Sequence, residues 1–435
     1  MKQNLQKVHP RAAGIDVGSK SFYVSAEDQE VRVFPTFTAD CQALREYLLS
    51  KGITTVAMES TGVYWVNLYG VLEEAGMEVY LVNGRDVKNV PGRKSDIKDC
   101  QWLRQLHSYG LLRKSFIPEG GIRKVRSYLR LRQDHIRASA TQIHLMQKSL
   151  TQMNIRLADV INDITGASGL RIIGAILDGE RDAGRLTELC VSQIKDRKKE
   201  LVYKSLEGDW QEEHLFALQQ AFRTWEHYNE LIRACDKAVE KQLAVMTEGK
   251  PTVEARSKRK KIRYHRPEIE NLHQPLLQLT EGKDPTGIPG LTDYSFLQIV
   301  SEVGTDMSAW PTEKHFTSWL KVAPMRSSSG KMIKRVTLKR HNKAGQLFRS
   351  LAQGILTSKH LALGVFGRNI RARRGGAVAI KAIARKIACY YYRVMTKGGD
   401  FVDQGIAVYE QQLQDRKRKY LEKMAAKLNL QLVPA

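Results

Sequence analysis

The sequence is poor in cysteine, in long apolar runs and in acidic side chains. Its five cysteines are scattered without a CxxC pair, which argues against a zinc module and favours a reducing compartment. No apolar run reaches the length of a membrane-spanning helix, so we expect no membrane partner. The first residues lack the apolar core of a signal peptide. These absences together favour a cytoplasmic protein.

Acids are outnumbered by bases. The 435-residue chain has 70 Lys and Arg against 46 Asp and Glu, a net charge of +24. Such a charge holds a protein near polyanions, because each phosphate that a cation neutralises releases a counterion. Nucleic acid is therefore the expected partner, and the nucleoid the expected place within the cytoplasm. At this length we expect two or three domains with sizeable cores.

Residues 11–115 alternate between patterns typical of strands and of helices. Three short β-rich runs come first, AAGIDVG, SFYVSAE and VRVFPTF, close enough together to form hairpins. Helices are expected at 41–52, 63–76 and 94–110, the first two ending at glycine, with strands at 54–60 and 77–83. We therefore predict an α/β domain over residues 1–118 with a ribonuclease-H-like (RuvC-like) layout, a mixed sheet flanked by helices.

Four carboxylates of this domain have the spacing of a metal site. Asp16 and Glu59 lie in or at the end of predicted strands, and Asp96 and Asp99 share one face of the last helix. Mg²⁺ takes carboxylate oxygens, and paired metal ions stabilise the attacking and leaving oxygens of a phosphodiester. The spacing predicts a Mg²⁺-dependent phosphoryl-transfer site, although each acid taken alone could be an ordinary helix cap or surface acid.

Basic residues gather before the last helix of this domain and again between residues 247 and 283. Both groups are predicted to contact nucleic-acid phosphates, with a solvated loop and a flexible linker as the alternatives. In either case residues 247–283 are predicted to be a basic linker between domains. The residues in question are Arg85, Lys88, Arg93, Lys94, Lys258, Arg259, Lys260 and Lys261.

A seven-residue apolar repeat runs from residue 122 to residue 164. A strict heptad keeps one seam turned toward a partner helix, so residues 119–246 are predicted to be a long helical, coiled-coil region with an insertion. A second apolar stripe between residues 215 and 243 could supply an antiparallel partner within the chain. Pairing with a second chain is the alternative, and both remain open. The repeat consists of Ile122, Leu129, Ile136, Ile143, Leu150, Leu157 and Ile164.

The C-terminal part has a second catalytic candidate, a serine-rich loop with the sequence RSSSGK at 326–331. A serine next to glycine is poorly hindered, and nearby cations could stabilise the charge of an attacked phosphate: Arg326, Lys331, Lys334 and Arg335. Arg326, Lys331 and Lys343 are also predicted to bind nucleic acid. Such runs are also typical of flexible turns. The flanking patterns predict a mostly α-helical domain over 284–400 and a helical tail over 401–435.

Seven motifs occur in the order in which the DEDD insertion-sequence transposases have them. They are AGIDVGSKSFYVS, AMESTGVYW, KSDIKDCQWL, IPGLTDYSFLQIVSEVG, WLKVAP, SSSGK and NKAGQLFRSLAQ. Over residues 10–165 and 284–400 the chain thus resembles insertion-sequence family one-ten, which includes Piv-like invertases and bridge-RNA-guided recombinases. The resemblance implies that Asp16, Glu59, Asp96 and Asp99 hold Mg²⁺. It also implies that Ser329, or its neighbour Ser328, is a nucleophile that forms a covalent phosphoserine link to DNA.

The resemblance further implies an RNA-guided DNA transposase or site-specific recombinase. A noncoding guide (bridge) RNA would pair with donor and target DNA, and the chain would act as a homo-oligomer, a dimer or a tetramer. Lys331 and Gln346 depart from the family, which often has a second glycine and a Gly-Asn pair there. Two other functions fit the residues: a metal-dependent, structure-selective DNA nuclease resembling a Holliday-junction resolvase, and a nucleic-acid-binding protein without catalysis.

Overall fold

The structure, a computed structural model, describes residues 6–27, 30–84, 95–254, 260–262, 264–324, 326–329, 332–335, 342–359, 361–398 and 400–430. The chain divides into two compact units, residues 1–117 and 118–435. Among the described residues, no helix combines the length and the apolar character needed to cross a membrane. The finer boundaries predicted at residues 246, 283 and 400 stay predictions.

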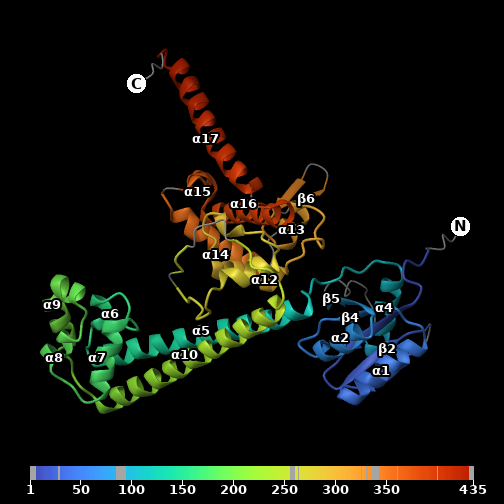
Figure 1. The fold of residues 1–435 in the computed structure, drawn as a ribbon, viewed down its shortest axis with the longest axis horizontal. Helices are drawn as coiled ribbons and strands as arrows, with labels where there is room; N and C mark the ends of the chain where they lie inside the picture. Colours follow the sequence, from blue (N-terminus) through green and yellow to red (C-terminus); the bar gives the residue numbers. More distant parts are fainter. Residues whose placement is uncertain are drawn as a thin grey trace. The chain divides into compact units, whose positions relative to one another are not determined.

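The N-terminal unit is a mixed sheet with helices on both faces (Figure 1, blue). Its five strands lie in the order β3-β2-β1-β4-β5, in which β1, β2 and β3 pair antiparallel and β1, β4 and β5 pair parallel. The α/β character predicted for this part is confirmed. The elements are β1 (Ala12–Val17), β2 (Ser21–Ser25), β3 (Arg32–Pro35), α1 (Thr38–Ser50), β4 (Thr55–Glu59), α2 (Trp65–Glu74), β5 (Glu78–Val82) and α4 (Asp96–Ser108).

Alternation along the strands assigns side chains to the two faces of this sheet. Ile15 of β1 and Met58 of β4 join Leu44 and Leu72 in the core beneath α1 and α2. Ala57, one residue before Met58, instead packs with Leu103 of α4. Because neighbouring side chains of a strand point to opposite faces, Asp16 and Glu59 lie on the face that α4 covers.

The predicted helix ends of this unit are also confirmed. Gly52 follows α1 with a φ of 65°, and Gly76 follows α2 with a φ of 76°. Glycine adopts this left-handed conformation without the steric strain that a Cβ imposes, which is why it ends helices. The two glycines therefore mark where the chain leaves each helix for the next parallel strand.

The second unit begins with two long helices that pack against each other, α5 (Gly120–Gln152) and α10 (Glu212–Thr247) (Figure 1). They run antiparallel, since Gly121 at the start of α5 lies against Met246 at the end of α10. The second apolar stripe of the sequence is on α10, so the antiparallel partner within the chain exists. Pairing with a second chain remains a prediction.

The prediction of an unbroken heptad helix through residue 164 is wrong. The helix α5 ends at Gln152, and Asn154 has a φ of 53°. Leu157 and Ile164 lie beyond this break, buried in a core that short helices form with the end of the pair (Figure 1). These helices are α6 (Leu157–Val160), α7 (Ala167–Leu177), α8 (Ala183–Glu188) and α9 (Ser192–Leu206).

The rest of the chain is mostly helical, as predicted. Two short strands form the only sheet described here, a hairpin between α13 and α14. The elements are α11 (His273–Leu279), η1 (Pro285–Gly287), α12 (Asp293–Val303), α13 (Glu313–Trp319), β6 (Arg326–Ser329), β7 (Met332–Arg335), α14 (Lys343–Thr357), α15 (Ala362–Arg374), α16 (Gly376–Lys397) and α17 (Asp400–Lys427). The tail predicted over 401–435 thus corresponds to α17.

The described residues 260–262 and 264–283, predicted to belong to a basic linker between domains, are instead part of the folded unit. Ile269, Leu272 and Leu276 are buried, the last of them within α11. The linker prediction rested on the charged run at 258–266 alone. It therefore took no account of the apolar residues that follow this run. The described second half of the segment is therefore part of the folded C-terminal unit.

A buried ion pair joins the long helices to the helices that follow. Arg132 and Asp236 are each 1 % exposed, and the Arg132 Nε donates to Asp236 Oδ1 over 2.6 Å. Arg132 also donates to the Tyr294 hydroxyl of α12 at 2.8 Å and to the His265 carbonyl at 3.1 Å. The Glu268 N–H donates to Asp236. This network satisfies a charge that would otherwise be costly to bury.

Replacement of Arg132 by alanine is expected to destabilise the protein strongly. The change leaves the Asp236 carboxylate buried without its counterion, a loss of about 3–5 kcal/mol in the free energy of unfolding. The measurement is urea unfolding followed by circular dichroism. Arg137→Ala is the control, because Arg137 pairs with Asp134 on the exposed side of the same helix. It should cost below about 1 kcal/mol. Equal losses in the two variants would contradict the assignment.

Candidate active site

The two strand acids lie at the carboxyl ends of neighbouring parallel strands. The strands β1 and β4 pair with Ile15 opposite Met58, and Asp16 and Glu59 come directly after this pair. Both acids lie on the sheet face that α4 covers. The carboxyl ends of parallel strands are where open α/β sheets bind their ligands.

The helix α4 brings two further acids to the same face. Asp96 and Asp99 are in its first turn, where the helix dipole favours negative charge. Ser95 begins the helix by accepting the Lys98 N–H over 3.4 Å. The helix lies so close to β1 that a Cβ on Gly14 would be 2.3 Å from the Cys100 carbonyl oxygen. Only glycine permits this approach two residues before Asp16.

The four carboxylates interact electrostatically. The pKa of Asp16 is raised from 3.8 to about 6, first by burial and then by the negative charges of Asp96, Glu59 and Asp99. Like charges disfavour the ionised form of a neighbouring carboxyl group. The structure therefore places the acids of the four-residue pattern near one another.

A glycine that sequence reasoning missed shapes the position of Glu59. A Cβ on Gly84, two residues after β5, would lie 2.1 Å from Glu59 Oε1. The same carboxylate oxygen accepts the Thr61 hydroxyl over 3.3 Å. The Glu59 side chain thus occupies space that is open only because residue 84 has no side chain. The available signal was a lone glycine between a predicted strand and a basic cluster.

The donor set fits a hard divalent cation by its chemistry. All four groups are carboxylates, the ligands that Mg²⁺ prefers, and a cation would relieve the repulsion felt by Asp16. Within the described ranges no three Asp, Glu, His or Cys side chains are arranged so that they could hold one ion as they stand. Metal binding would therefore require some of these carboxylates to turn toward one another.

The serines of the predicted loop belong to a strand instead. Residues 326–329 form β6, and Ser328 pairs with Ile333 of β7 while Ser329 pairs with Met332. Ser329 is therefore the last strand residue before the connection to β7. Backbone pairing between β6 and β7 accounts for the difference from the predicted loop. A run of serines next to glycine does not indicate such pairing.

Two family models match the chain. A model for the DEDD transposase of IS110, described as a transposase, matches residues 13–155, which contain all four acids. A model described as the transposase IS116/IS110/IS902 family matches residues 286–358, which contain the serine hairpin. The chain belongs to the IS110 family of transposases. No curated protein matches it. Membership of a transposase family implies an enzyme that cuts and rejoins DNA.

Several cations predicted to bind nucleic acid in this transposase lie outside the described residues. These are Arg85, Lys88, Arg93, Lys94, Lys258, Arg259 and Lys331. Of the others, Lys261 is exposed, and Arg326 begins β6 opposite Arg335. Lys343 begins α14, and its pKa is lowered by burial and by the nearby Arg130. The nucleic-acid contacts of these residues stay predictions.

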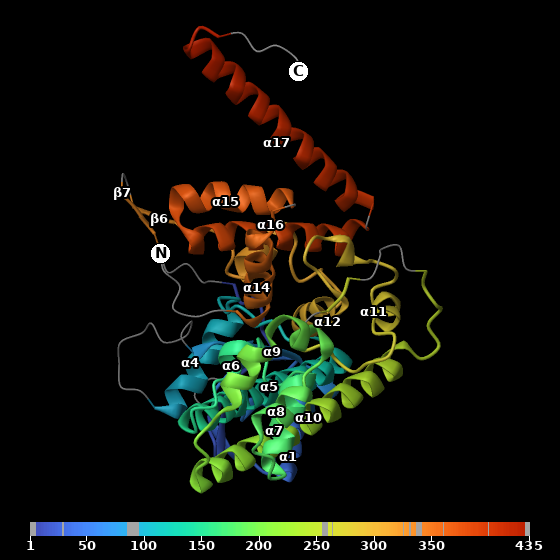
Figure 2. The same cartoon turned by 90° about the vertical axis from the view of Figure 1, so that its left-hand side faces the viewer.

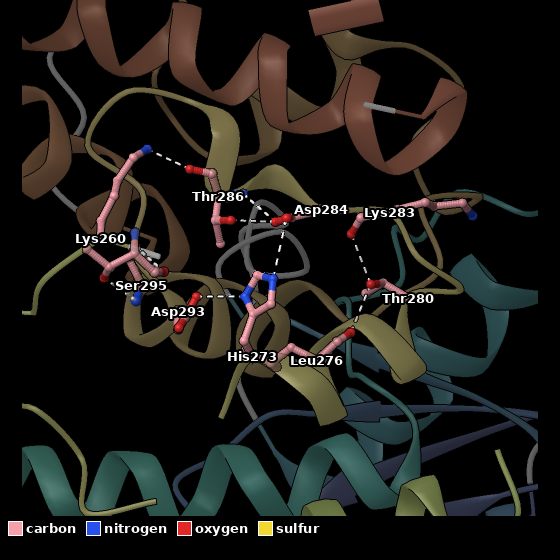
Figure 3. Close-up of polar contacts among 10 residues, drawn as sticks. Lys260, His273, Leu276, Thr280, Lys283, Asp284, Thr286, Asp293 and Ser295 are labelled. Atoms are coloured by element: carbon pink, nitrogen blue, oxygen red, sulfur yellow. Dashed lines mark hydrogen bonds and ion pairs between the residues drawn. The ribbon is translucent and has the colours of Figure 1, made fainter. Parts of the chain in front are cut away.

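Lys260 has a different role from the one predicted. Its ammonium group donates to the Thr286 carbonyl oxygen at 2.5 Å (Figure 3). It also donates to the Ile288 carbonyl oxygen at 2.7 Å. Burial lowers its pKa. Because two of its three N–H groups hold the segment before α12, Lys260 is part of the folded unit rather than a free phosphate ligand.

A buried histidine beside Lys260 was also missed. His273 is 1 % exposed, its Nδ1 lies 2.8 Å from Asp293 Oδ1, and its Nε2 lies 3.4 Å from Asp284 Oδ2 (Figure 3). Asp284 and Asp293 raise its pKa to about 9, so the ring is charged at neutral pH. The network fixes the segment between α11 and α12. A histidine with two aspartates 11 and 20 residues later was the available signal.

The repulsion at Asp16 gives a prediction about stability and pH. A raised pKa means that the unfolded chain releases this proton first, so ionisation destabilises the fold as the pH rises from 3.8 to about 6. Asp16→Asn should therefore raise the free energy of unfolding at about pH 7.5 by about 1 kcal/mol, after allowance for solvent screening. The gain should vanish near pH 4.

Thermal unfolding in EDTA at the two pH values measures this effect. Glu74→Gln is the control, because Glu74 is an exposed carboxylate at the end of α2. It should change the melting temperature little at either pH. A gain for Asp16→Asn of the same size at both pH values would argue against electrostatic repulsion as its cause.

Proposed function

We propose that this transposase cuts and exchanges DNA strands with a Mg²⁺ site on a ribonuclease-H-like domain and with a serine nucleophile. Asp16, Glu59, Asp96 and Asp99 form the metal site, and Ser329 is the nucleophile, with Ser328 as the neighbouring candidate. The observation that carries the proposal is the convergence of acids from β1, β4 and α4 on one face of the sheet.

The residues of the acidic site have distinct tasks in this proposal. Mg²⁺ bound by the carboxylates offsets the negative charge that develops on the scissile phosphate. Asp16 is partly buried, which raises its pKa. Its carboxylate therefore supplies negative charge to the metal site at a position where water screens that charge weakly. Asp96 and Asp99 are held in place by the N-terminal turn of α4.

The serine forms the covalent link in this proposal. Its oxygen bonds to phosphorus, one P–O bond of the DNA backbone breaks, and the departing sugar oxygen takes up a proton. A serine hydroxyl is a weak nucleophile, so the reaction also needs a base that accepts the hydroxyl proton, a transfer that a metal ion bound to the oxygen would ease by lowering the hydroxyl pKa. The serines adjoin Arg326 in sequence, and a cation can stabilise the extra negative charge of the attacked phosphate.

Guidance by RNA and assembly of subunits complete the proposal. A noncoding bridge RNA pairs with donor and target DNA, and the chain acts as a dimer or tetramer. The support is the family resemblance together with the net charge of +24, which suits a protein that handles several nucleic-acid strands. A structure-selective nuclease that uses water in place of serine is the competing function.

Replacement of one acid should separate cleavage from binding. Asp99→Asn is expected to lower strand cleavage in Mg²⁺ by about a thousandfold or more, because a metal ligand and its charge are lost. Binding of junction DNA should stay within about threefold, since the metal site supplies little of the phosphate contact. Cleavage is measured on labelled DNA and binding by gel shift in EDTA. Glu74→Gln is again the control, and full activity of Asp99→Asn would refute the acidic site.

Replacement of single serines tests the nucleophile. The protein, its RNA, Mg²⁺ and junction DNA are incubated, stopped with detergent and separated by electrophoresis. A DNA-linked protein band is expected for the native chain and for Ser327→Ala, and none for Ser329→Ala, which lacks the attacking oxygen. Loss of the band in Ser328→Ala alone would move the nucleophile by one residue. DNA cleavage by all three variants, with no DNA-linked band in any of them or in the native chain, would favour the nuclease.

A further inference from the structure

A long part of the C-terminal unit contains no acid. Between Glu313 and Asp400 the sequence has 20 Lys and Arg and no Asp or Glu. The stretch includes β6, β7 and the helices α14, α15 and α16. Apart from those at its two ends, its cations therefore have no carboxylate neighbours in sequence, and any compensation must come from elsewhere in the fold or from a ligand.

Some of these cations have partners inside the unit. Arg393 of α16 pairs with Glu313 of α13, its Nε donating to Oε2 over 2.6 Å. Lys386 lies over the Phe366 ring at 4.9 Å, and Arg368 donates to the Ser358 carbonyl oxygen. These contacts tie α13, α15 and α16 together. Their cations are structural.

The cations at the turn between α15 and α16 are different. The two helices form an antiparallel hairpin, since Gly367 of α15 packs against Ile383 of α16, and Gly375 reverses the chain with a φ of 85° (Figure 2). Arg371 and Arg374 are exposed in the last turn of α15. Neither side chain has a hydrogen bond or ion pair with the described part of the chain. Arg373, also exposed, donates only to its own helix, at the Asn369 carbonyl.

Two features of α16 add to the positive potential at this turn. No side chain caps its N-terminus, so the first backbone N–H groups have no side-chain acceptor. Lys381, about one turn into the helix, is a further cation, and it lies near Arg349 of α14. The turn thus gathers positive charge, and no ion pair among the described residues joins it to an acid. We call Arg371, Arg373, Arg374 and Lys381 the hairpin surface.

We propose that the hairpin surface binds the phosphate backbone of double-stranded DNA. Unpaired, exposed arginines that are three residues apart lie on one face of a helix, and each phosphate that they neutralise releases a counterion. Val378 is the one large hydrophobic residue that is exposed among the described residues 361–398, so this surface lacks the aromatic platforms with which proteins stack single-stranded bases. The contact is therefore made to the backbone, independent of sequence.

This surface lies outside the residues that the family models match, 13–155 and 286–358. The inference rests on the DNA substrate of the proposed function but not on the acids or the serine. It assigns to α15 and α16 the task of holding duplex DNA, while the two catalytic candidates act on it.

The test compares two double variants of the full chain. Arg371→Gln/Arg374→Gln removes two charges from the hairpin surface, and Arg223→Gln/Arg233→Gln removes two from exposed positions of α10. Binding to a duplex of about 30 base pairs and arbitrary sequence is followed by fluorescence anisotropy in EDTA, at several salt concentrations. Circular dichroism checks that both variants fold. We expect both to fold, because the four replaced arginines are exposed.

The slope of log K against log salt should fall by about 1.8 in the hairpin variant and stay unchanged in the α10 variant. Between about 50 and 200 mM salt, the native affinity should then drop about tenfold more than that of the hairpin variant. Equal slopes in the two variants would overturn the proposal. It would also be overturned if the hairpin variant lost affinity only for single-stranded RNA of the same length and not for the duplex. Because Asp99→Asn should keep the native slope, a failure here is distinct from a failure of the catalytic proposal.

Discussion

The candidate chemistry of the N-terminal unit depends on how closely α4 approaches β1. At Gly14 the backbones are so near that a methyl group would overlap the Cys100 carbonyl oxygen. This contact fixes the first turn of α4, and with it Asp96 and Asp99, over the strand that contains Asp16. The result is a concentration of negative charge that raises the pKa of Asp16. A fold that keeps such repulsion gains nothing in stability from it, which is typical of residues kept for function.

The cations of the C-terminal unit include buried ones that have partners and, among the described residues, exposed ones that have no carboxylate partner. Inside, Arg132 is matched by Asp236 and by further oxygen acceptors, and Lys260 by two carbonyl groups. At the turn between α15 and α16, arginines face solvent without a carboxylate. Burial explains the difference. A charge removed from water is costly unless it is paired and hydrogen-bonded, whereas water solvates an exposed charge that has no protein partner.

Much of the N-terminal unit could be predicted from the sequence, because its signals are local. Strand alternation, glycine at helix ends and the spacing of Asp96 and Asp99 are read directly from neighbouring residues. The meeting of these acids with Asp16 and Glu59 followed from the order of strands and helices. The role of Gly84 could not be predicted in this way, since it depends on a side chain from another strand.

Predictions failed where a pattern continued past a physical boundary. The heptad spacing persists to Ile164, but α5 ends at Gln152, because apolar spacing does not reveal where the backbone turns. The basic run at 258–266 indicated an exposed segment, yet composition cannot show which ammonium group faces inward, as Lys260 does. The serines were assigned to a loop because their cross-strand partners are set by pairing rather than by composition.

The antiparallel pair of α5 and α10 has a consequence for distance. From Arg132, where the pair is bonded to α12, α5 continues for 20 residues to Gln152, where the cluster of short helices begins. At a rise of about 1.5 Å per residue, the two ends of this segment are about 30 Å apart. A ligand that touches both ends must span that length, which corresponds to about nine base pairs of duplex at about 3.4 Å each. The length of the helix pair therefore sets the minimum length of a ligand that contacts both parts of the C-terminal unit.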